Sequence, residues 1–173
     1  MVCDTNIWRD FHEGGILTYL FTLDYIIHIP KDVLEFELMH YSWSQDLLAS
    51  DVQLECLTGE EIEDCDKILG IYVASDGIEP SYYDRTCLAL AIKREWVLAT
   101  NENCLKAIAD RCAIRVENTC SLLQELINNS MISKLHIADA IESMLNANRN
   151  LPGGNEYEKI KRLRQGLDLL CNE

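Results

Sequence analysis

The sequence has few basic residues, no long hydrophobic segment and no signal-like N-terminus. Among its 173 residues, 15 Lys and Arg stand against 29 Asp and Glu, which gives a formal net charge of −14. No stretch approaches the roughly 20 apolar residues of a membrane-spanning helix. Asp4 lies where a secretory signal would carry basic and then apolar residues. We therefore expect a soluble, cytoplasmic protein with no membrane contact.

Cysteine patterns that bind metal or form redox sites are also missing. The chain has eight cysteines but no C-x-x-C spacing, and its four histidines are scattered, which argues against a zinc or redox site. Most cysteines lie in apolar segments, so we interpret them as small buried residues in a reducing compartment. The length suits one hydrophobic core with a helical appendage.

Short apolar segments alternate with helical patterns along most of the chain. The expected strands are 1–3, 25–29, 51–57, 96–100 and 113–116. The expected helical or apolar-rich segments are 7–11, 16–23, 31–41, 58–75, 81–92, 104–111, 119–129, 133–149 and 155–171. Strands that alternate with helices predict a three-layer α/β/α fold with a central parallel sheet and an extra C-terminal helical segment.

Four acidic residues fall where a sheet of this kind binds ligands. Asp4 ends the first strand and Glu102 follows the fourth, and parallel sheets bind ligands beyond the carboxyl ends of their strands. Asp84 lies in the first turn of its helix, and Glu37 lies on the apolar face of an earlier helix. Carboxylates that are brought together repel one another, so we expect them to bind a hard cation, Mg²⁺ or Mn²⁺.

Each of these acids also has a structural interpretation. An Asp at a strand end is often a turn residue, and Asp84 completes a capping-box pattern that begins at Ser81. Glu37 could form a buried salt bridge, and Glu35 competes with it as the second acid. We prefer Glu37 because it shares a helix face with the apolar Val33.

Four sequence blocks carry a resemblance to a known family. Val2–Trp8 resembles the opening of PIN domains, and Ile29–Leu38 resembles their strand and helix with the second acid. Pro80–Ala91 is similar to the helix of the third acid. Leu98–Leu105 is similar to the family's Thr-Gly/Asn-Asp-x-x-Leu segment, with Glu102 in place of the usual Asp. The blocks occur in the family's order, and the resemblance is nearest to VapC-like toxins.

This resemblance implies a metal-dependent endoribonuclease that hydrolyses RNA phosphodiester bonds with a metal-activated water. Such toxins are often dimeric and often held inactive by a small antitoxin, so we expect a homodimer and an antitoxin partner. The implied PIN-like domain covers 1–130, with 131–173 as a helical extension packed on the same domain. The implied roles are catalysis by Asp4, Glu37, Asp84 and Glu102, metal binding by Asp4, Asp84 and Glu102, orientation of carboxylates or water by Asn6 and Thr100, and substrate binding by Arg85.

The charge balance and Glu102 keep other functions open. A nucleic-acid-binding protein normally has a basic surface, so the charge of −14 favours bound metal, clustered basic residues such as Lys93 and Arg94, or a basic partner. Glu102 is one methylene longer than Asp, and a shift of about 1 Å in a catalytic group can be costly. A catalytically weak PIN scaffold acting through protein binding, and a metal-dependent phosphohydrolase or DNA nuclease, therefore remain alternatives.

Overall fold

The computed structural model describes residues 1–76, 80–149 and 151. The helix expected at 155–171 therefore lies outside the described residues. Within the described part of the chain, no helix combines the length and the apolar character needed to cross a bilayer.

The chain divides into two compact units. The sheet unit comprises Met1–Asn6 and Tyr25–Glu117. The helical unit comprises Ile7–Asp24 and the described part of the chain from Asn118 onward. The domain division expected from the sequence stays a prediction.

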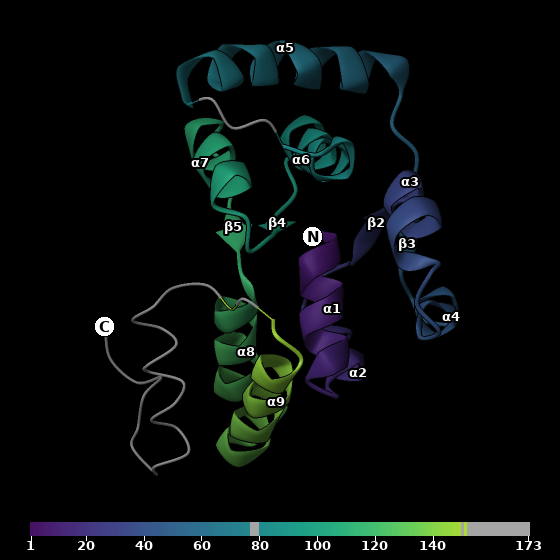
Figure 1. The fold of residues 1–173 in the computed structure, drawn as a ribbon, viewed down its shortest axis with the longest axis vertical. Coiled ribbons are helices and arrows are strands. Elements are labelled where there is room, and N and C mark those ends of the chain that lie inside the picture. The colour runs from purple at the N-terminus through teal and green to yellow at the C-terminus, as the bar shows by residue number, and fades with distance from the viewer. Residues whose placement is uncertain (77–79, 150, 152–173) are drawn as a thin grey trace. The chain divides into compact units, whose positions relative to one another are not determined.

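The sheet unit is built on five short strands, all parallel, in the order β3-β2-β1-β4-β5 (Figure 1). They are β1 (Val2–Cys3), β2 (His28–Pro30), β3 (Gln53–Glu55), β4 (Leu98–Ala99) and β5 (Val116–Glu117). Val2 in the central strand pairs with His28 on one side and with Leu98 on the other. The α/β class, with a central parallel sheet flanked by helices, is thus confirmed.

Helices connect these strands. They are α3 (Lys31–Val33), the π-helical turn η1 (Leu34–Leu38), α4 (Ser44–Leu48), α5 (Gly59–Asp76), α6 (Tyr82–Arg94) and α7 (Asn103–Arg111). Helix α1 (Thr5–Glu13) begins in the sheet unit and continues into the helical unit. Both expected capping boxes are present, because Thr58 with Glu61, and Ser81 with Asp84, exchange hydrogen bonds between side chain and backbone.

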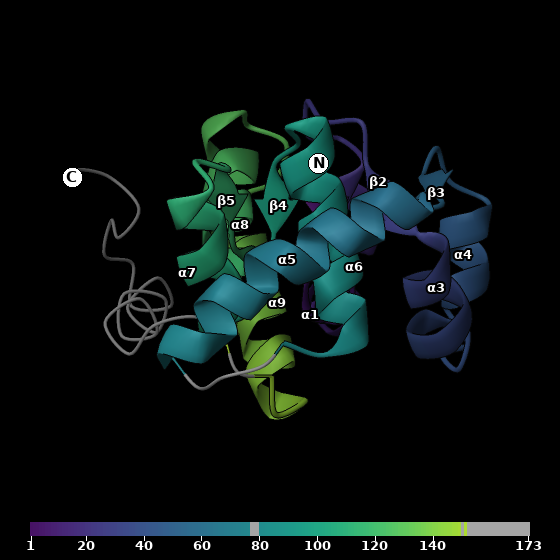
Figure 2. The same ribbon diagram turned by 90° about the horizontal axis from the view of Figure 1, so that it is seen from above.

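Helix α6 is the central helix of the sheet unit. It contacts β1, β2 and β4 as well as α5, and Figure 2 shows α5 lying across it. The segment Cys87–Ala91 is buried, as its nearly all-round apolar pattern predicts. A helix that leads into a parallel strand runs antiparallel to it, so the first turn of α6 lies at the edge where the strands end.

Some strands begin later than expected. The second begins at His28 rather than at residue 25, and Ile26 is 68% exposed. The pairing of this strand with β1 has the register Val2–His28, where the His28 N–H donates to the Met1 carbonyl (2.8 Å), and the amino group of Met1 donates to the Ile26 carbonyl (2.7 Å). The fifth strand begins at Val116 rather than at residue 113, because Ala113 has a φ of 57°, outside the extended region.

The helix expected at 31–41 is not a continuous α-helix. After α3 the chain widens into η1, where the Met39 N–H donates to the Leu34 carbonyl five residues earlier (2.9 Å). Leu34 and Leu38 are buried in this turn, while Glu37 is half-buried. Single π-helical turns are rare and occur frequently at functional sites.

Cysteine burial agrees with the expectation only in part. Cys3 and Cys87 are buried, whereas Cys56 is exposed. The Cys87 thiol donates to the carbonyl oxygen of Cys3 at 3.8 Å. The two buried cysteines therefore link α6 to the central strand.

The helical unit is held together by a buried charge as well as by apolar side chains. It contains most of α1 together with α2 (Leu17–Leu20), α8 (Thr119–Asn128) and α9 (Lys134–Asn146). Asp10 on α1 is fully buried, and it accepts hydrogen bonds from the Thr119 hydroxyl (2.6 Å) and from Nε of Arg149 (2.6 Å). A buried carboxylate needs such partners, so Asp10 ties the start of α8 and the end of α9 to α1.

Candidate active site

Asp4 lies at the carboxyl end of the central strand. Its backbone N–H donates to the Ala99 carbonyl (3.0 Å), which extends the pairing of β1 with β4. Its side chain is buried, and the Thr100 hydroxyl donates to its Oδ2. Burying a carboxylate is costly unless hydrogen bonds stabilise its charge, so Thr100 supports Asp4 in this position.

Thr100 also joins Asp4 to the next acid, Glu102. The Thr100 hydroxyl accepts a hydrogen bond from the Glu102 backbone N–H (3.0 Å). Glu102 is the N-cap residue of α7, yet its side chain makes no capping bond. Its Oε1 instead accepts a hydrogen bond from Nδ2 of Asn6 (2.8 Å). Asn6 and Thr100 thus contact the carboxylates that the sequence expects them to orient, while their part in catalysis stays a prediction.

Glu37, rather than Glu35, faces the end of β1. The hydroxyl of Thr5, the residue after Asp4, donates to Oε2 of Glu37. Glu35 is exposed and forms an ion pair with Lys31 one helical turn away, at 3.5 Å. Thr5 is a supporting residue to which the sequence assigned no role, although its place directly after Asp4 was a usable signal.

Asp84 begins α6 and serves as its capping residue. Its Oδ2 accepts from the Ser81 backbone N–H (3.1 Å), and its own N–H donates to Oγ of Ser81 (3.1 Å). The positive end of the helix dipole also favours a carboxylate in this turn. The structural interpretation of Asp84 is therefore correct, and it is compatible with a place in an acidic site because the side chain is only half-buried.

The thiol of Cys87 lies in the electric field of three of these acids. Burial raises the pKa of Cys87 well above its usual value. The negative charges of Asp4, Asp84 and Glu37 raise it further, because they oppose formation of the thiolate. The three carboxylates are thus close enough to Cys87 for their charges to act on its thiol.

The fourth acid belongs to the same region. Burial raises the pKa of Cys104 in α7, and the charges of Asp84 and Glu102 raise it further. Asp84 thus acts on both thiols and links Glu102 to the other acids. We call Asp4, Glu37, Asp84 and Glu102 together the acidic edge.

The acidic edge suits a hard cation in its chemistry, because every donor is a carboxylate oxygen. In its geometry, no group of three or more His, Cys, Asp or Glu side chains among the described residues is arranged to hold a metal ion. Thr5, Asn6, Thr100 and the Ser81 N–H each donate a hydrogen bond to one of the four carboxylates.

The other end of α6 carries a second ionic cluster, in which acids are paired with a cation. Arg94 donates to Glu55 and to Glu61 (Nε to Oε1, 3.0 Å), and its guanidinium lies 5.1 Å from the ring centroid of Trp96. His28 stacks on Trp96 at 3.7 Å, and its Nδ1 lies 2.8 Å from Glu55. Arg94 therefore has a structural role rather than the substrate-binding role considered from the sequence.

The pKa values of this second cluster follow from its pairing. The hydrogen bond from Arg94 lowers the pKa of Glu61 to about 2, with help from the Thr58 backbone N–H. Burial acts to raise the pKa of Glu55, but hydrogen bonds from His28 and Arg94 outweigh it and hold that pKa below its usual value. Burial lowers the pKa of His28, although Glu55 opposes the change. His28 is therefore neutral at neutral pH and donates its Nδ1–H to Glu55.

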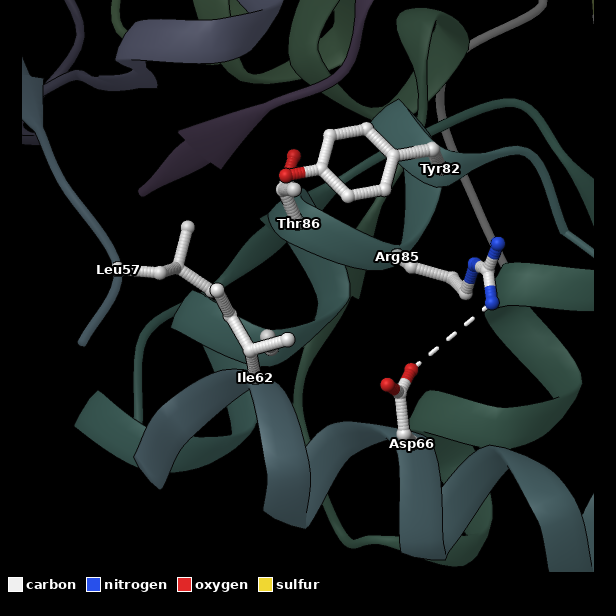
Figure 3. Close-up of a pocket in the computed structure, with 7 residues that line it drawn as sticks. Leu57, Ile62, Asp66, Tyr82, Arg85 and Thr86 are labelled. Atoms are coloured by element: carbon white, nitrogen blue, oxygen red, sulfur yellow. Dashed lines mark ion pairs between the residues drawn. The ribbon is translucent and has the colours of Figure 1, made fainter. Parts of the chain in front are cut away.

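Arg85 lines a pocket between α5 and α6 (Figure 3). Its Nη1 lies 3.8 Å from Oδ1 of Asp66 on α5. Arg85 follows Asp84 directly in the sequence, so the pocket begins within the same helical turn as the acidic edge.

Neither a family model nor a curated protein matches the chain. The PIN-domain resemblance therefore stays a prediction. The side chains of the acidic edge, and the helices and strands that carry them, are therefore the basis for a proposed function.

Proposed function

We propose that the protein is a metal-dependent endoribonuclease that hydrolyses RNA phosphodiester bonds at the acidic edge. One observation carries the proposal: Asp4 and Glu102 follow the paired strands β1 and β4 and are joined through Thr100, and the carboxylate of Glu37 is bonded to Thr5, next to Asp4. Gathering like charges costs free energy. Such an arrangement is typical of a site that a cation completes rather than of a structural element.

In this proposal the chain's own groups position the reaction. The cation is held by Asp4, Asp84 and Glu102, with Glu37 as the further catalytic acid. Thr100 and Asn6 orient two of these carboxylates through the hydrogen bonds that they donate. Such supporting groups keep metal ligands in their productive orientation.

A bound Mg²⁺ or Mn²⁺ would supply activation of a water molecule and stabilisation of the charge that develops on the phosphate oxygens. Asn6 holds only Oε1 of Glu102, so the second oxygen of this carboxylate would face the cation while Asn6 keeps the side chain in place. A divalent ion is often the largest local charge in such a site.

The proposal extends to partners. The protein would act in the cytoplasm as a homodimeric toxin that a small antitoxin holds inactive. The net charge of −14 supports a basic partner segment, because complementary charge speeds association and selects the partner. Co-expression with the product of an adjacent gene for a small DNA-binding protein is expected to give a complex in which RNA cleavage is suppressed.

Cleavage of total RNA with Mg²⁺ or Mn²⁺, with and without EDTA, tests the activity. We expect cleavage by the parent protein only when metal is present, and its loss in Asp4→Asn and in Asp84→Asn. Asp64→Asn is a matched control, because Asp64 pairs with Lys67 and Lys93 away from the acidic edge. Activity that survives either substitution at the acidic edge would contradict the proposed site.

A second candidate is a catalytically weak PIN-like scaffold that acts through protein binding. It is favoured by the present hydrogen bonding of the acids, which leaves no three-ligand group arranged for a metal among the described residues. The same assay separates the candidates, because a scaffold would bind its partner and cleave no RNA with either metal. A phosphohydrolase or DNA nuclease would instead hydrolyse single-stranded DNA or simple phosphodiesters under the same conditions.

A further inference from the structure

The pocket between α5 and α6 is small, and both apolar and polar side chains line it. Its volume is about 220 Å³, and Figure 3 shows the side chains that line it, among them Leu57, Ile62, Asp66, Tyr82, Arg85 and Thr86. Sites for drug-sized ligands usually measure about 300–1,000 Å³. This pocket therefore suits a single planar group rather than a larger ligand.

An aromatic ring and an aliphatic side chain line the apolar part of the pocket. Tyr82 is 46% exposed and Ile62, on the neighbouring helix, is 37% exposed. The Tyr82 hydroxyl donates to Asp32 (2.8 Å), which holds the ring in place and raises the pKa of Tyr82. An exposed aromatic ring that is held in place offers a stacking surface for a nucleobase, because every base has a π-face.

The polar wall places a donor beside an acceptor. The side chains of Arg85 and Asp66, 3.8 Å apart, are 31% and 61% exposed. An ion pair this exposed contributes little to stability, so a ligand can replace it at little cost. Guanine presents its O6 acceptor beside the N1–H and N2–H donors. The O6 atom can accept from Arg85, and the two N–H groups can donate to Asp66. Uracil offers the carboxylate only one N–H.

Aromatic rings connect the pocket with the acidic edge. Tyr82 and Arg85 lie on either side of Asp84 in the first turn of α6. The ring of Tyr83 packs edge-on against Tyr82 (5.5 Å between centroids) and stacks with Phe36 of η1 (6.4 Å). The pocket and Asp84 of the acidic edge therefore share the first turn of α6.

We propose that this pocket is a base-binding subsite that takes an unstacked guanine of single-stranded RNA. The inference rests on the proposed nuclease function, since it places the guanosine beside the phosphate that the acidic edge cleaves. Tyr82 and Ile62 enclose the base, Arg85 donates to its O6, and Asp66 accepts from its two N–H groups. Arg85 and Asp66 thereby determine specificity, and cleavage occurs next to guanosine.

Binding of short RNA to the Asp4→Asn variant, which leaves the RNA intact, tests the subsite. The probes are fluorescein-labelled oligouridylates with and without one central guanosine, and affinity is measured by fluorescence anisotropy with Mg²⁺ present. We expect the guanosine probe to bind more tightly by roughly 5- to 100-fold, the range of a good bidentate base contact.

Two further substitutions in the same background localise the effect. Asp66→Asn is expected to abolish the difference in affinity between the guanosine probe and plain oligouridylate. Asp64→Asn lies on the same helix, changes the charge equally and should keep the preference, because Asp64 bonds Lys67 and Lys93 instead. Tyr82→Leu should weaken binding of the guanosine probe by roughly fivefold or more, through loss of stacking.

Equal affinity for the probes with and without guanosine would overturn the subsite, and so would no measurable binding of either probe. A preference for guanosine that is undiminished in Asp66→Asn would overturn it as well. Failure of the nuclease proposal has a different signature. In that case the parent protein cleaves no RNA with either metal, while the guanosine preference persists. Cleavage that depends on the acids but shows no base preference would retain the nuclease and remove the subsite.

Discussion

The two ends of helix α6 hold acidic side chains in different ways. At the C-terminal end, Arg94 donates to Glu55 and Glu61, so these charges are balanced within the protein. At the N-terminal end, Asp84 and the other members of the acidic edge accept hydrogen bonds from hydroxyl, amide and backbone donors. Asp84 and Arg94 are ten residues apart, so about 15 Å of helix separates the two arrangements.

The difference distinguishes acids that stabilise the fold from acids that the fold positions for another purpose. The hydrogen bonds of Arg94 lower the pKa of Glu61 to about 2, so the ionised pair favours the folded state. The acidic edge instead brings like charges together, and their charges raise the pKa of the neighbouring Cys87 thiol. We infer that the C-terminal end of α6 is structural, and under the proposed function the N-terminal end would bind the cation.

The largest effect on stability is expected from Arg94→Met. The substitution leaves Glu55 and Glu61, with side chains only 20% and 13% exposed, without their shared cation. Breaking a buried ion pair costs 3–5 kcal/mol, and partial exposure reduces this to about 2–3 kcal/mol. Urea unfolding measures the loss. Lys93→Met is the matched control and should destabilise the protein far less, because its pair with Asp64 is at the surface. Equal losses would remove the contrast.

Added metal should stabilise the protein through the N-terminal end of α6. At 100 times its dissociation constant, Mn²⁺ is expected to raise the free energy of unfolding by about 2.7 kcal/mol. The increment should disappear in Asp84→Asn and persist in Glu61→Gln, which changes the same charge at the other end of the helix. Urea unfolding with and without Mn²⁺ measures it. The same increment in both variants would show that the metal binds elsewhere.

A smaller effect, on activity alone, is expected from Asn6→Ala. Loss of the amide releases the Glu102 carboxylate from its 2.8 Å hydrogen bond. Groups that orient metal ligands contribute about 10- to 100-fold to metal affinity or activity, so RNA cleavage should fall within that range while the melting temperature stays close to that of the parent. Asn103→Ala, beside Glu102 in an exposed position, should leave cleavage unchanged. Unaltered cleavage in Asn6→Ala would exclude a positioning role.

The smallest effect is a pH dependence of stability that arises from His28, in the second ionic cluster at the C-terminal end of α6. Burial lowers the pKa of His28 in the folded state, so the unfolded chain takes up a proton first as the pH falls through about 6.5. The free energy of unfolding should therefore decrease from neutral pH toward lower pH. Urea unfolding at several pH values measures this slope, and His28→Gln should flatten it. An unchanged slope would mean that another group is responsible.

Local sequence patterns predicted most of the helices and strands, because capping boxes and hydrophobic periodicity depend on residues that lie within one or two turns of one another. The capping boxes at Thr58 and Ser81 mark the starts of α5 and α6, and the apolar segment Cys87–Ala91 indicated a helix buried on nearly all sides. The predicted start of β2 was wrong, because that start depends on the register with β1, a strand distant in the sequence, which pairs Val2 with His28. No local sequence pattern of comparable strength marks η1, the π-helical turn that interrupts the helix expected at 31–41.

By itself, the sequence determined the α/β class, the parallel sheet and the set of acids that could meet at its edge. Only the tertiary structure decided that Glu37 bonds Thr5, that Asn6 reaches Glu102, and that Arg85 lines a pocket beside the acids. The reason is physical. The hydrogen-bonded partners lie 32 and 96 residues apart, and their meeting depends on how strands and helices pack, which hydrophobic periodicity alone does not specify.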